Sequence, residues 1–600
     1  MRLCRLVAIE LAIAGSAAGA DAQITDPPLL MPEWSADCDQ DDDWFGMSLA
    51  SAGDVNGDGF GDVIIGDQGY DHGQVDEGVA WVYLGTADGL SPSPAWKAES
   101  DQADAAFGLR VAGAGDVDGD GFDDVLVLAR HFSSGAVNEG AAFVWRGGPP
   151  GLGDDGTPAN ADWTVTGGGS NVQLSSGALA DVNGDGFADA IVGSGFYSGE
   201  FPREISFQGL VRVYHGSALG LSTVPDEEAF GNQEEAFYGG AIERAGDVNA
   251  DGFDDVFIGI NLASFPTGEG WVTCRYGAPG GLYSGGSWSA HGGQANAGFG
   301  SSLGCAGDLN ADGFDDVFVG ATGYSSSPTT KGGVFVYYGG AAGLGPTATA
   351  ADADWRAYGN LGQSSGFGSA AGPGDFDGDG YDDLAVGAYS YSGGQNFEGV
   401  LFAWHGGPSG PAPAIGHPGN AEARFESNQA SAWLGAVVAA AGDVNGDGLR
   451  DALVTARLYD GAVPDGGRVY ALHGGNPWTD LQSGLAGAAG IPRLLGLGSL
   501  QPLSPVELSL DDAAPSAQVV LIVGMSVLGA PLKGGVLVPD PGPPGLLLRL
   551  TTSAGGSFDG AATWPSGLPA GLTFVMQCWV VDPGGPAGYS ASNGVLATVP

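Results

Sequence analysis

The stretch Asp54-Val-Asn-Gly-Asp-Gly-Phe-Gly-Asp62 decides the fold of this chain, because the chain repeats it. Its pattern is D-x-[DN]-x-[DN]-G-x-x-D, in which oxygen-bearing side chains alternate with other, mostly small residues. Seven copies start 61 to 68 residues apart, and a spacing this regular indicates one supersecondary unit repeated along the chain. The six later copies begin at Asp116, Asp181, Asp247, Asp308, Asp375 and Asp443.

The nonapeptide, called the acidic loop below, offers the compact set of oxygen donors that a hard cation needs. An EF-hand loop would place a bidentate acid at position 12, but all seven copies have Ile or Val there. We therefore expect the side chains of positions 1, 3, 5 and 9 and the backbone carbonyl of position 7 to hold the ion. Ca²⁺ is predicted, as up to seven structural ions, because Mg²⁺ demands a stricter octahedron and keeps its waters. The predicted ligands are Asp54, Asn56, Asp58, Phe60, Asp62, Asp116, Asp118, Asp120, Phe122, Asp124, Asp181, Asn183, Asp185, Phe187, Asp189, Asp247, Asn249, Asp251, Phe253, Asp255, Asp308, Asn310, Asp312, Phe314, Asp316, Asp375, Asp377, Asp379, Tyr381, Asp383, Asp443, Asn445, Asp447, Leu449 and Asp451.

The acidic loop has two alternative interpretations. Dockerins carry a similar loop, but there a helix follows it, whereas a short β-branched run follows every copy in this chain. A plain Asp/Asn/Gly turn without metal is the second alternative. Seven intact copies argue against it, because a turn alone does not need the same acids each time.

Around every acidic loop the chain repeats the same parts. An aromatic-Gly step such as Phe45-Gly46 precedes most loops, and a β-branched run such as residues 62–66 follows. After a variable stretch comes an apolar run that ends in Gly, such as residues 78–85. These parts predict four short strands per repeat, and units of this kind are typical of a β-propeller. We expect an all-β fold with a seven-bladed β-propeller, and we expect the aromatic residues that open each repeat to be core between blades: Trp34, Trp96, Trp163, Phe230, Trp288, Trp355 and Phe425.

The order of aromatic-Gly step, acidic loop and Val-Gly-Ala (Val319-Gly-Ala321, Val386-Gly-Ala388) resembles the FG-GAP repeat of integrin α-subunit propellers. The resemblance covers about three quarters of the chain. It implies a propeller over residues 32–480. It also implies that the strand near Trp34 pairs with residues 467–474 of the last repeat, and that ligands bind on the face away from the acidic loops.

The variable stretches join the second and third strands, so they leave the sheet at the ends opposite the acidic loops. Loops held by a rigid scaffold commonly carry function, and exposed Tyr and Arg side chains are frequent contact residues. No catalytic residue is predicted, because His215, His405 and His473 occupy a slot that Leu84 fills in another repeat. The candidate ligand-binding residues are Tyr70, His72, Arg130, His131, Tyr197, Tyr324, Tyr389, Tyr391, Arg457 and Tyr459.

The formal charge is −52, from 19 basic and 71 acidic side chains. Such a chain repels nucleic acid and anionic membranes, so nucleic acid is not expected as a partner. Residues 1–22 have the basic start, apolar run and small residues of a signal peptide, and no later run is long enough to span a bilayer. The protein is therefore predicted to be secreted, extracellular or at the cell surface. From residue 490 to residue 600 the acidic loops stop, and short apolar runs between Pro/Gly turns predict a small β-sandwich accessory domain.

These features favour a secreted, calcium-binding β-propeller without enzymatic activity, which mediates adhesion or binds a protein or glycan ligand at the cell surface. Two alternatives stay open. One is an extracellular carbohydrate-active enzyme, a lyase or hydrolase on a propeller scaffold, because propellers host both binding and catalysis. The other is a purely structural component of a surface layer.

Overall fold

The computed structural model describes residues 29–30, 32–40, 45–198, 207–231, 237–260, 268–327, 331–359, 366–393, 395–475, 478–482, 484–487, 491–497, 505–511, 513–541, 545–553, 556–563, 568 and 572–598. The predicted signal peptide, residues 1–22, lies outside these ranges. The chain divides into two compact units, which are described separately. The larger unit contains Trp34–Glu422 and Glu426–Gly474, and the smaller contains Gly475–Pro600, Ala423–Phe425 and the residues before Trp34.

The fold is all-β, and the helical elements among the described residues are three-residue 3-10 turns: η2 (Ala350–Asp352), η3 (Pro418–Asn420) and η4 (Pro586–Gly588). Each acidic loop joins the first and second strands of its repeat, as predicted. The strands of the larger unit are β2 (Trp34–Asp37), β3 (Ser48–Gly53), β4 (Asp62–Asp67), β5 (Val79–Tyr83), β6 (Trp96–Glu99), β7 (Phe107–Gly115), β8 (Asp124–Ala129), β9 (Ala141–Trp145), β10 (Trp163–Thr166), β11 (Ser176–Ala180), β12 (Asp189–Ser194), β13 (Leu210–Tyr214), β14 (Glu227–Phe230), β15 (Tyr238–Gly246), β16 (Asp255–Ile260), β17 (Trp271–Arg275), β18 (Ser287–His291), β19 (Phe299–Gly307), β20 (Asp316–Ala321), β21 (Gly333–Tyr337), β22 (Ala348–Thr349), β23 (Trp355–Tyr358), β24 (Phe367–Gly374), β25 (Asp383–Ala388), β26 (Val400–Trp404), β27 (Ile415–Gly416), β29 (Leu434–Gly442), β30 (Asp451–Ala456) and β31 (Arg468–Leu472).

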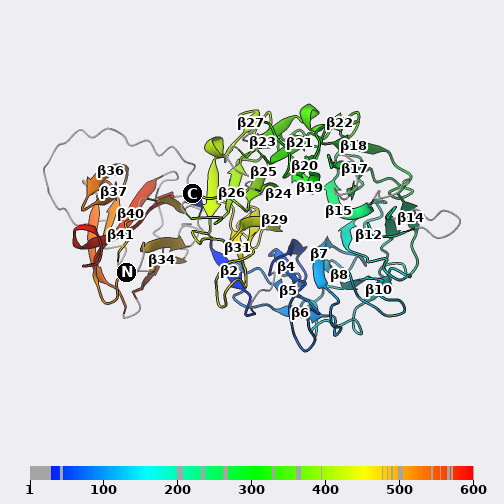
Figure 1. The fold of residues 1–600 in the computed structure, drawn as a ribbon, viewed down its shortest axis with the longest axis horizontal. Coiled ribbons are helices and arrows are strands. Elements are labelled where there is room, and N and C mark those ends of the chain that lie inside the picture. The colour runs from blue at the N-terminus through cyan, green and yellow to red at the C-terminus, as the bar shows by residue number, and fades with distance from the viewer. Residues whose placement is uncertain are drawn as a thin grey trace. The chain divides into compact units, whose positions relative to one another are not determined.

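These strands form antiparallel sheets that follow one another around a common centre (Figure 1). Five repeats give the four-strand orders β3–β4–β5–β6, β7–β8–β9–β10, β11–β12–β13–β14, β15–β16–β17–β18 and β19–β20–β21–β23. The two-residue strands β22 and β27 extend the last two of these sheets by parallel pairing with β18 and β23. The sixth repeat contributes β24–β25–β26 to this unit, and its next strand, β28 (Ala423–Glu426), falls mostly in the smaller unit.

The last sheet joins the two ends of the larger unit. Its order is β29–β30–β31–β2, so the strand nearest the N-terminus completes the sheet of the seventh repeat. The antiparallel register places Trp34 opposite Ala471 and Asp37 opposite Arg468, which is the pairing expected from the sequence. The first strand of each repeat contacts the first strand of the next, and β29 contacts β3.

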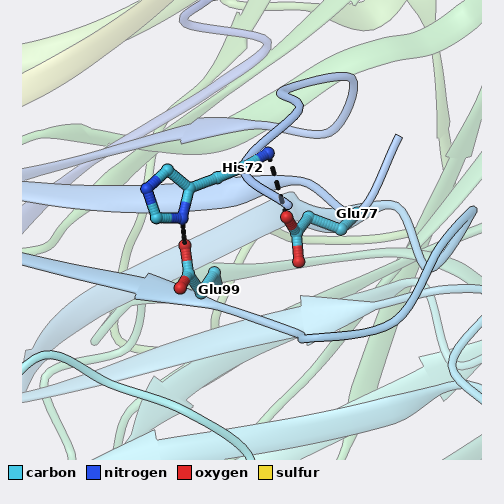
Figure 2. Close-up of side chains that lie close together, drawn as sticks. All are labelled: His72, Glu77 and Glu99. Carbon is cyan, nitrogen blue, oxygen red and sulfur yellow. Dashed lines mark hydrogen bonds and ion pairs between the residues drawn. The ribbon is translucent and has the colours of Figure 1, made fainter. Parts of the chain in front are cut away.

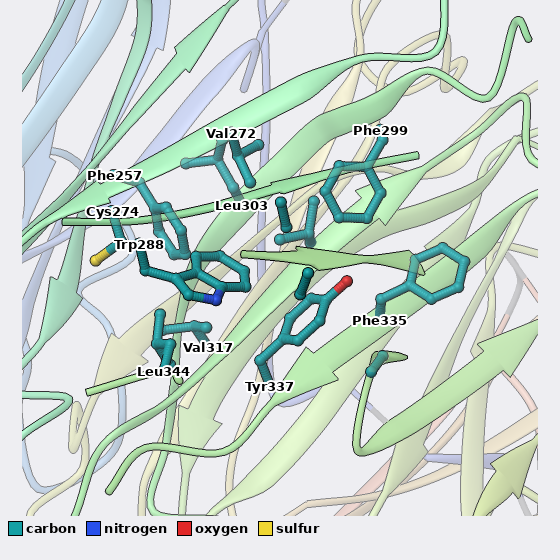
Figure 3. Close-up of a cluster of buried hydrophobic side chains, with 14 of the residues drawn as sticks. Phe257, Val272, Cys274, Trp288, Phe299, Leu303, Val317, Phe335, Tyr337 and Leu344 are labelled. Carbon is teal, nitrogen blue, oxygen red and sulfur yellow. The ribbon is translucent and has the colours of Figure 1, made fainter. Parts of the chain in front are cut away.

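The core lies between consecutive sheets. One buried cluster combines Phe257 and Trp288 from the fourth repeat with Phe299, Phe335 and Tyr337 from the fifth (Figure 3). The outer-strand tryptophan of one sheet meets an aromatic ring in the third strand of the next sheet. This contact is edge-to-face, and the ring centroids are 4.9 to 5.7 Å apart in the pairs Trp34 and Tyr83, Trp96 and Trp145, Trp163 and Tyr214, Trp288 and Tyr337, and Trp355 and Trp404. Each such pair adds about 0.5–1.5 kcal/mol to the burial of its rings.

The third repeat departs from this series. Trp96 lies opposite Val82 in the first sheet, and the corresponding register in the third sheet places Glu227 opposite Val213. Phe230 is three residues later and 44% exposed, so the expectation that it belongs to the aromatic core series is wrong. The carboxylate of Glu227 instead accepts hydrogen bonds from the N–H groups of Leu282 and Tyr283, both at 2.8 Å.

The smaller unit contains two sheets, in the orders β28–β1–β32–β41–β40–β35–β38 and β33–β34–β39, and a separate β36–β37 hairpin. Leu494 and Leu510 from the second sheet share a buried cluster with Val519, Cys578 and Val595 from the first. No residue of this unit matches the acidic-loop pattern. Besides β28, its strands are β1 (Leu29–Leu30), β32 (Trp478–Gln482), β33 (Arg493–Leu497), β34 (Pro505–Asp511), β35 (Gln518–Gly524), β36 (Val527–Leu532), β37 (Gly535–Pro539), β38 (Leu546–Thr551), β39 (Phe558–Thr563), β40 (Thr573–Val581) and β41 (Tyr589–Thr598).

Candidate metal centres

Each acidic loop winds around the carboxylate at its first position. In the first loop, Asp54 accepts hydrogen bonds from the N–H groups of Asp58 at 3.0 Å and Gly59 at 2.8 Å. The corresponding two bonds are present in all seven loops. Position 6 requires Gly because its φ lies between +88° and +92° in every copy, a region that other residues avoid. The sequence pattern therefore specifies one loop conformation, with the acidic side chains drawn together.

The carboxylate at position 9 is buried and anchors the loop to the sheet. One oxygen of Asp62 accepts from the N–H of Val55 at 2.9 Å, and the other accepts from the N–H of Gly85 at 2.8 Å. Gly85 closes the third strand, and all seven repeats have the same pair of bonds. Burial raises the pKa of these carboxyls to about 7 in most loops and to about 8 in Asp316 and Asp451. Burial disfavours the charged form of a carboxyl, and the two N–H donors offset this rise in pKa only in part.

The donor set fits a divalent cation. In the two loops with Asp at position 3, three carboxylates each bring an oxygen within 4.8 Å of the others: Asp116, Asp118 and Asp120, and Asp375, Asp377 and Asp383. In the other five loops the residue at position 3 is Asn, whose carbonyl oxygen is a neutral donor of the same kind. A cation at this point would favour the ionised form of the crowded acids. The role of the carbonyl at position 7 stays a prediction.

A chain of hydrogen bonds joins each acidic loop to the one before it. The N–H at position 8 donates to the carbonyl at position 1 of the preceding loop, as from Asp123 to Asp54 at 3.2 Å. The bond occurs between all consecutive loops, and Gly61 of the first loop donates to Asp443 of the seventh at 2.7 Å. Four loops have Asp at position 8. In each, the carboxylate of this Asp also accepts a hydrogen bond from the backbone N–H at position 1 of the preceding loop, at 2.7 to 2.9 Å. These residues are Asp123, Asp254, Asp315 and Asp382.

Sequence reasoning missed a second connection. The residue before the Gly that closes the third strand was interpreted as part of the scaffold, yet it faces position 3 of the acidic loop in two repeats. Arg146 pairs with Asp118, and Nδ1 of His405 lies 2.7 Å from Oδ2 of Asp377. The only two loops with Asp in place of Asn at position 3 are thus the two whose extra charge has a basic neighbour.

The loops between the second and third strands, called distal loops below, lie at the other ends of the strands. They carry the ten candidate ligand-binding residues, which are spread over six repeats. Several of the tyrosines pack against the third strand of their own repeat. Ring centroids are 5.0 Å apart for Tyr70 and Trp81 and 4.9 Å apart for Tyr324 and Phe335.

The other candidates make the following contacts. The rings of Tyr391, Tyr459, Tyr197 and Tyr389 lie 5.4 to 6.2 Å from those of Phe402, Tyr470, Phe230 and Trp433, in that order. The Arg130 guanidinium lies 4.4 Å from the ring centre of Phe196, and His72 pairs with Glu99. Burial lowers the pKa of Arg130, Arg457 and His131. Whether any of these residues contacts a ligand stays a prediction.

Four further aromatic residues in this region were not singled out from the sequence. Phe207 and Phe237 have left-handed backbone conformations, with φ of 50° and 48°, and their rings stack 5.3 Å apart. Phe397 and Trp433 occupy the corresponding positions between the sixth and seventh repeats, with φ of 53° and 56°. In both junctions the second residue donates its N–H to the carbonyl of the first. Phe207 is 40% exposed and Phe397 52% exposed.

Known proteins share this repeat. The profile of the family described as FG-GAP repeat matches residues 45–83, 174–214, 299–337 and 367–401, and each match contains an acidic loop. These matches define the class as a protein built from FG-GAP units. The chain is an FG-GAP repeat protein of the integrin α-like kind.

Three curated relatives illustrate the similarity. Integrin alpha pat-2 of Caenorhabditis briggsae is 43% identical over 103 residues, 16% of this chain and 8% of the relative. Integrin alpha-V of Gallus gallus is 31% identical over 220 residues, 35% of this chain and 19% of the relative. Phosphatidylinositol-glycan-specific phospholipase D of Rattus norvegicus is 35% identical over 171 residues, 28% of this chain and 19% of the relative. The matched segments therefore span less than a fifth of these relatives.

Within the described ranges, no helix has the length and apolar character needed to cross a membrane.

Proposed function

We propose that this protein is a secreted, Ca²⁺-stabilised, closed seven-bladed β-propeller that binds an extracellular protein or glycan and thereby mediates adhesion, without enzymatic activity. Residues 490–600 would form an accessory β-sandwich. The FG-GAP repeats and the integrin relatives support the extracellular, ligand-binding character. The all-oxygen donor sets of the acidic loops support Ca²⁺ as the ion.

The observation that carries ligand binding is the pair of exposed aromatic junctions among the distal loops. A left-handed conformation costs a bulky residue about 1–2 kcal/mol, which Gly and, to a degree, Asn and Asp avoid. Other repeats have Asp76, Asn138 and Asp465 at the position of Phe207. Phe207 and Phe397 thus lower the stability of the folded protein, and each keeps an aromatic ring partly exposed to solvent. Aromatic side chains at this kind of exposed site are suited to contact a ligand.

A double variant tests this role without damaging the fold. Gly adopts a φ near +50° freely, so Phe207→Gly with Phe397→Gly removes both rings and relieves both strained residues. The probes are a glycan array and a set of immobilised extracellular proteins, used with and without Ca²⁺. We expect calcium-dependent binding by the natural chain and at least a tenfold loss in the double variant, whose melting temperature stays equal or rises. Asn138→Gly is the matched control, since it changes the same backbone position without removing a ring.

Unchanged binding by the double variant would contradict the role of the aromatic junctions.

The second candidate function is enzymatic. It is supported by the phospholipase D relative and by the fact that propellers host both binding and catalysis. Turnover of a polysaccharide or of a glycosylphosphatidylinositol substrate, with no binding on either array, would overturn the non-enzymatic proposal.

A further inference from the structure

We propose that the distal loop of the first repeat holds a first-row transition-metal ion, for which Zn²⁺ is the probe, at His72, Glu77 and Glu99 (Figure 2). His72 and Glu77 lie in the loop before β5, and Glu99 lies at the end of β6. Val79 pairs with Glu99, so Glu77 lies in the segment that leads into the strand next to that of Glu99. One ligand atom from each of the three residues lies within 4.8 Å of the others. This site is separate from the acidic loops, which lie at the opposite ends of the strands.

The independent sign of a missing ligand is the carboxylate of Glu77. This residue is fully buried, and its Oε1 accepts hydrogen bonds from the N–H groups of His72 at 2.9 Å and Gln74 at 3.1 Å. Its Oε2 is buried and has no hydrogen-bond partner among the described residues. Leaving a buried acceptor unsatisfied is costly, so native structures rarely do so without a bound ion or water. Figure 2 shows this carboxylate beside His72 and Glu99.

The second repeat has an equivalent buried glutamate, and its distal loop forms without counterparts of His72 and Glu99. There Glu139 accepts the N–H groups of Ser134, Gly135 and Ala136 through Oε1, and the loop has the same form. Thr166 occupies the strand position of Glu99, because it pairs with Ala141 as Glu99 pairs with Val79. The imidazole and the second carboxylate of the first repeat are therefore additions to a loop that closes without them.

The donor set selects the type of metal. An imidazole nitrogen with two carboxylates suits Zn²⁺ and related ions, whereas Ca²⁺ prefers oxygen ligands alone. Nδ1 of His72 lies 2.6 Å from Oε2 of Glu99, so this nitrogen faces the carboxylate of Glu99. Three protein ligands leave a coordination position for water or for an outside group.

Lys97 is the competitor for this site. Its Nζ lies 3.6 Å from Oε2 of Glu99 and 3.5 Å from Nε2 of His72. The ammonium neutralises part of the negative charge when no metal is bound, and it repels an incoming cation. Lys97→Met keeps the aliphatic stem and removes the charge, so it should strengthen metal binding, whereas loss of a ligand should weaken it. These opposite signs separate a metal site from a structural ion pair.

The test uses the full chain in millimolar Ca²⁺, which occupies the acidic loops, and titrates Zn²⁺ by calorimetry. We expect one equivalent of Zn²⁺ per chain, a loss of at least tenfold in affinity for His72→Ala and for Glu99→Gln, and a gain for Lys97→Met. Glu139→Gln in the second repeat is the matched control and should bind Zn²⁺ as the natural chain does. Co²⁺ should give a ligand-field spectrum that His72→Ala abolishes.

Zn²⁺ uptake that is the same in His72→Ala as in the natural chain would overturn the proposal. So would uptake that Lys97→Met reduces, or the absence of any Zn²⁺ binding to a chain whose melting temperature shows that it is folded.

Discussion

The two ends of the strands in this protein are built on different principles. At the acidic-loop end, every repeat forms the same bonds around positions 1 and 9, and the loops are joined to one another. At the distal end the loops differ in length and composition, and what six of them share is one backbone bond, from the N–H of the Gly before the third strand to the carbonyl of a Tyr or Phe in the loop. The uniform end can therefore hold the repeats together, while the variable end is free to acquire individual features such as the aromatic junctions. Removal of Ca²⁺ and single substitutions at one end or the other test this difference.

Removing Ca²⁺ should have the largest effect. With free Ca²⁺ near ~1 mM and a dissociation constant of ~0.1 mM, each filled acidic loop adds about 1.4 kcal/mol, and seven together add on the order of 10 kcal/mol. That sum is comparable to the whole free energy of unfolding of a domain. Thermal melts in Ca²⁺ and in excess EDTA should therefore differ strongly. Equal melting temperatures would contradict a structural role for the uniform end.

At the distal end, Glu139→Ala should cost on the order of 2 kcal/mol, because three backbone N–H groups lose their acceptor. Burial alone would raise the pKa of Glu139, but the N–H groups of Gly135, Ser134 and Ala136 outweigh it and lower the pKa to about 2. The folded protein thus favours the ionised form. Its stabilisation is complete above the ordinary pKa near 4.5 and is lost as the pH falls through about 2.

Denaturant unfolding of the natural chain and of Glu139→Ala, compared between pH 7 and pH 2, measures this contribution. The difference in unfolding free energy should shrink toward the acidic limit. A difference that stays constant with pH would show that the carboxylate charge does not organise the distal loop.

The smallest effect concerns the connections between acidic loops. Asp382→Ala removes the acceptor for the N–H of Asp308 and should cost about 1–2 kcal/mol in saturating Ca²⁺. Ala188 occupies the same position in the third loop, and Gly115 lies beside it as Gly307 lies beside Asp382. Ala188→Asp should therefore gain a smaller amount. Chemical denaturation of both variants measures the two changes in unfolding free energy, which should have opposite signs. Changes of the same sign and size in both variants would show that the position-8 carboxylate does not join the loops.

The sequence predicted the repeats, their strands and the acidic loops because local spacing encodes them. Asp and Gly at fixed positions determine the loop, and β-branched runs determine the strands beside it. The pairing of Trp34 with the last repeat followed from the resemblance to integrin repeats. What the sequence could not show are contacts between repeats: Asp123 meets Asp54 across 69 residues, and Phe207 meets Phe237 across a junction. The prediction for Phe230 is wrong because this aromatic residue lies only three residues from the outer-strand position that Trp fills in other repeats, and Glu227 occupies that position.

We infer that the uniform end is a set of seven calcium sites that stabilise the fold. The most direct measurement is the number of Ca²⁺ ions bound per folded chain, by equilibrium dialysis or native mass spectrometry. We expect seven ions in the natural chain and six in Asp312→Ala, which removes one exposed predicted ligand at position 5 of the fifth loop. A folded natural chain that binds no Ca²⁺, or an Asp312→Ala variant that binds as many ions as the natural chain, would contradict this inference.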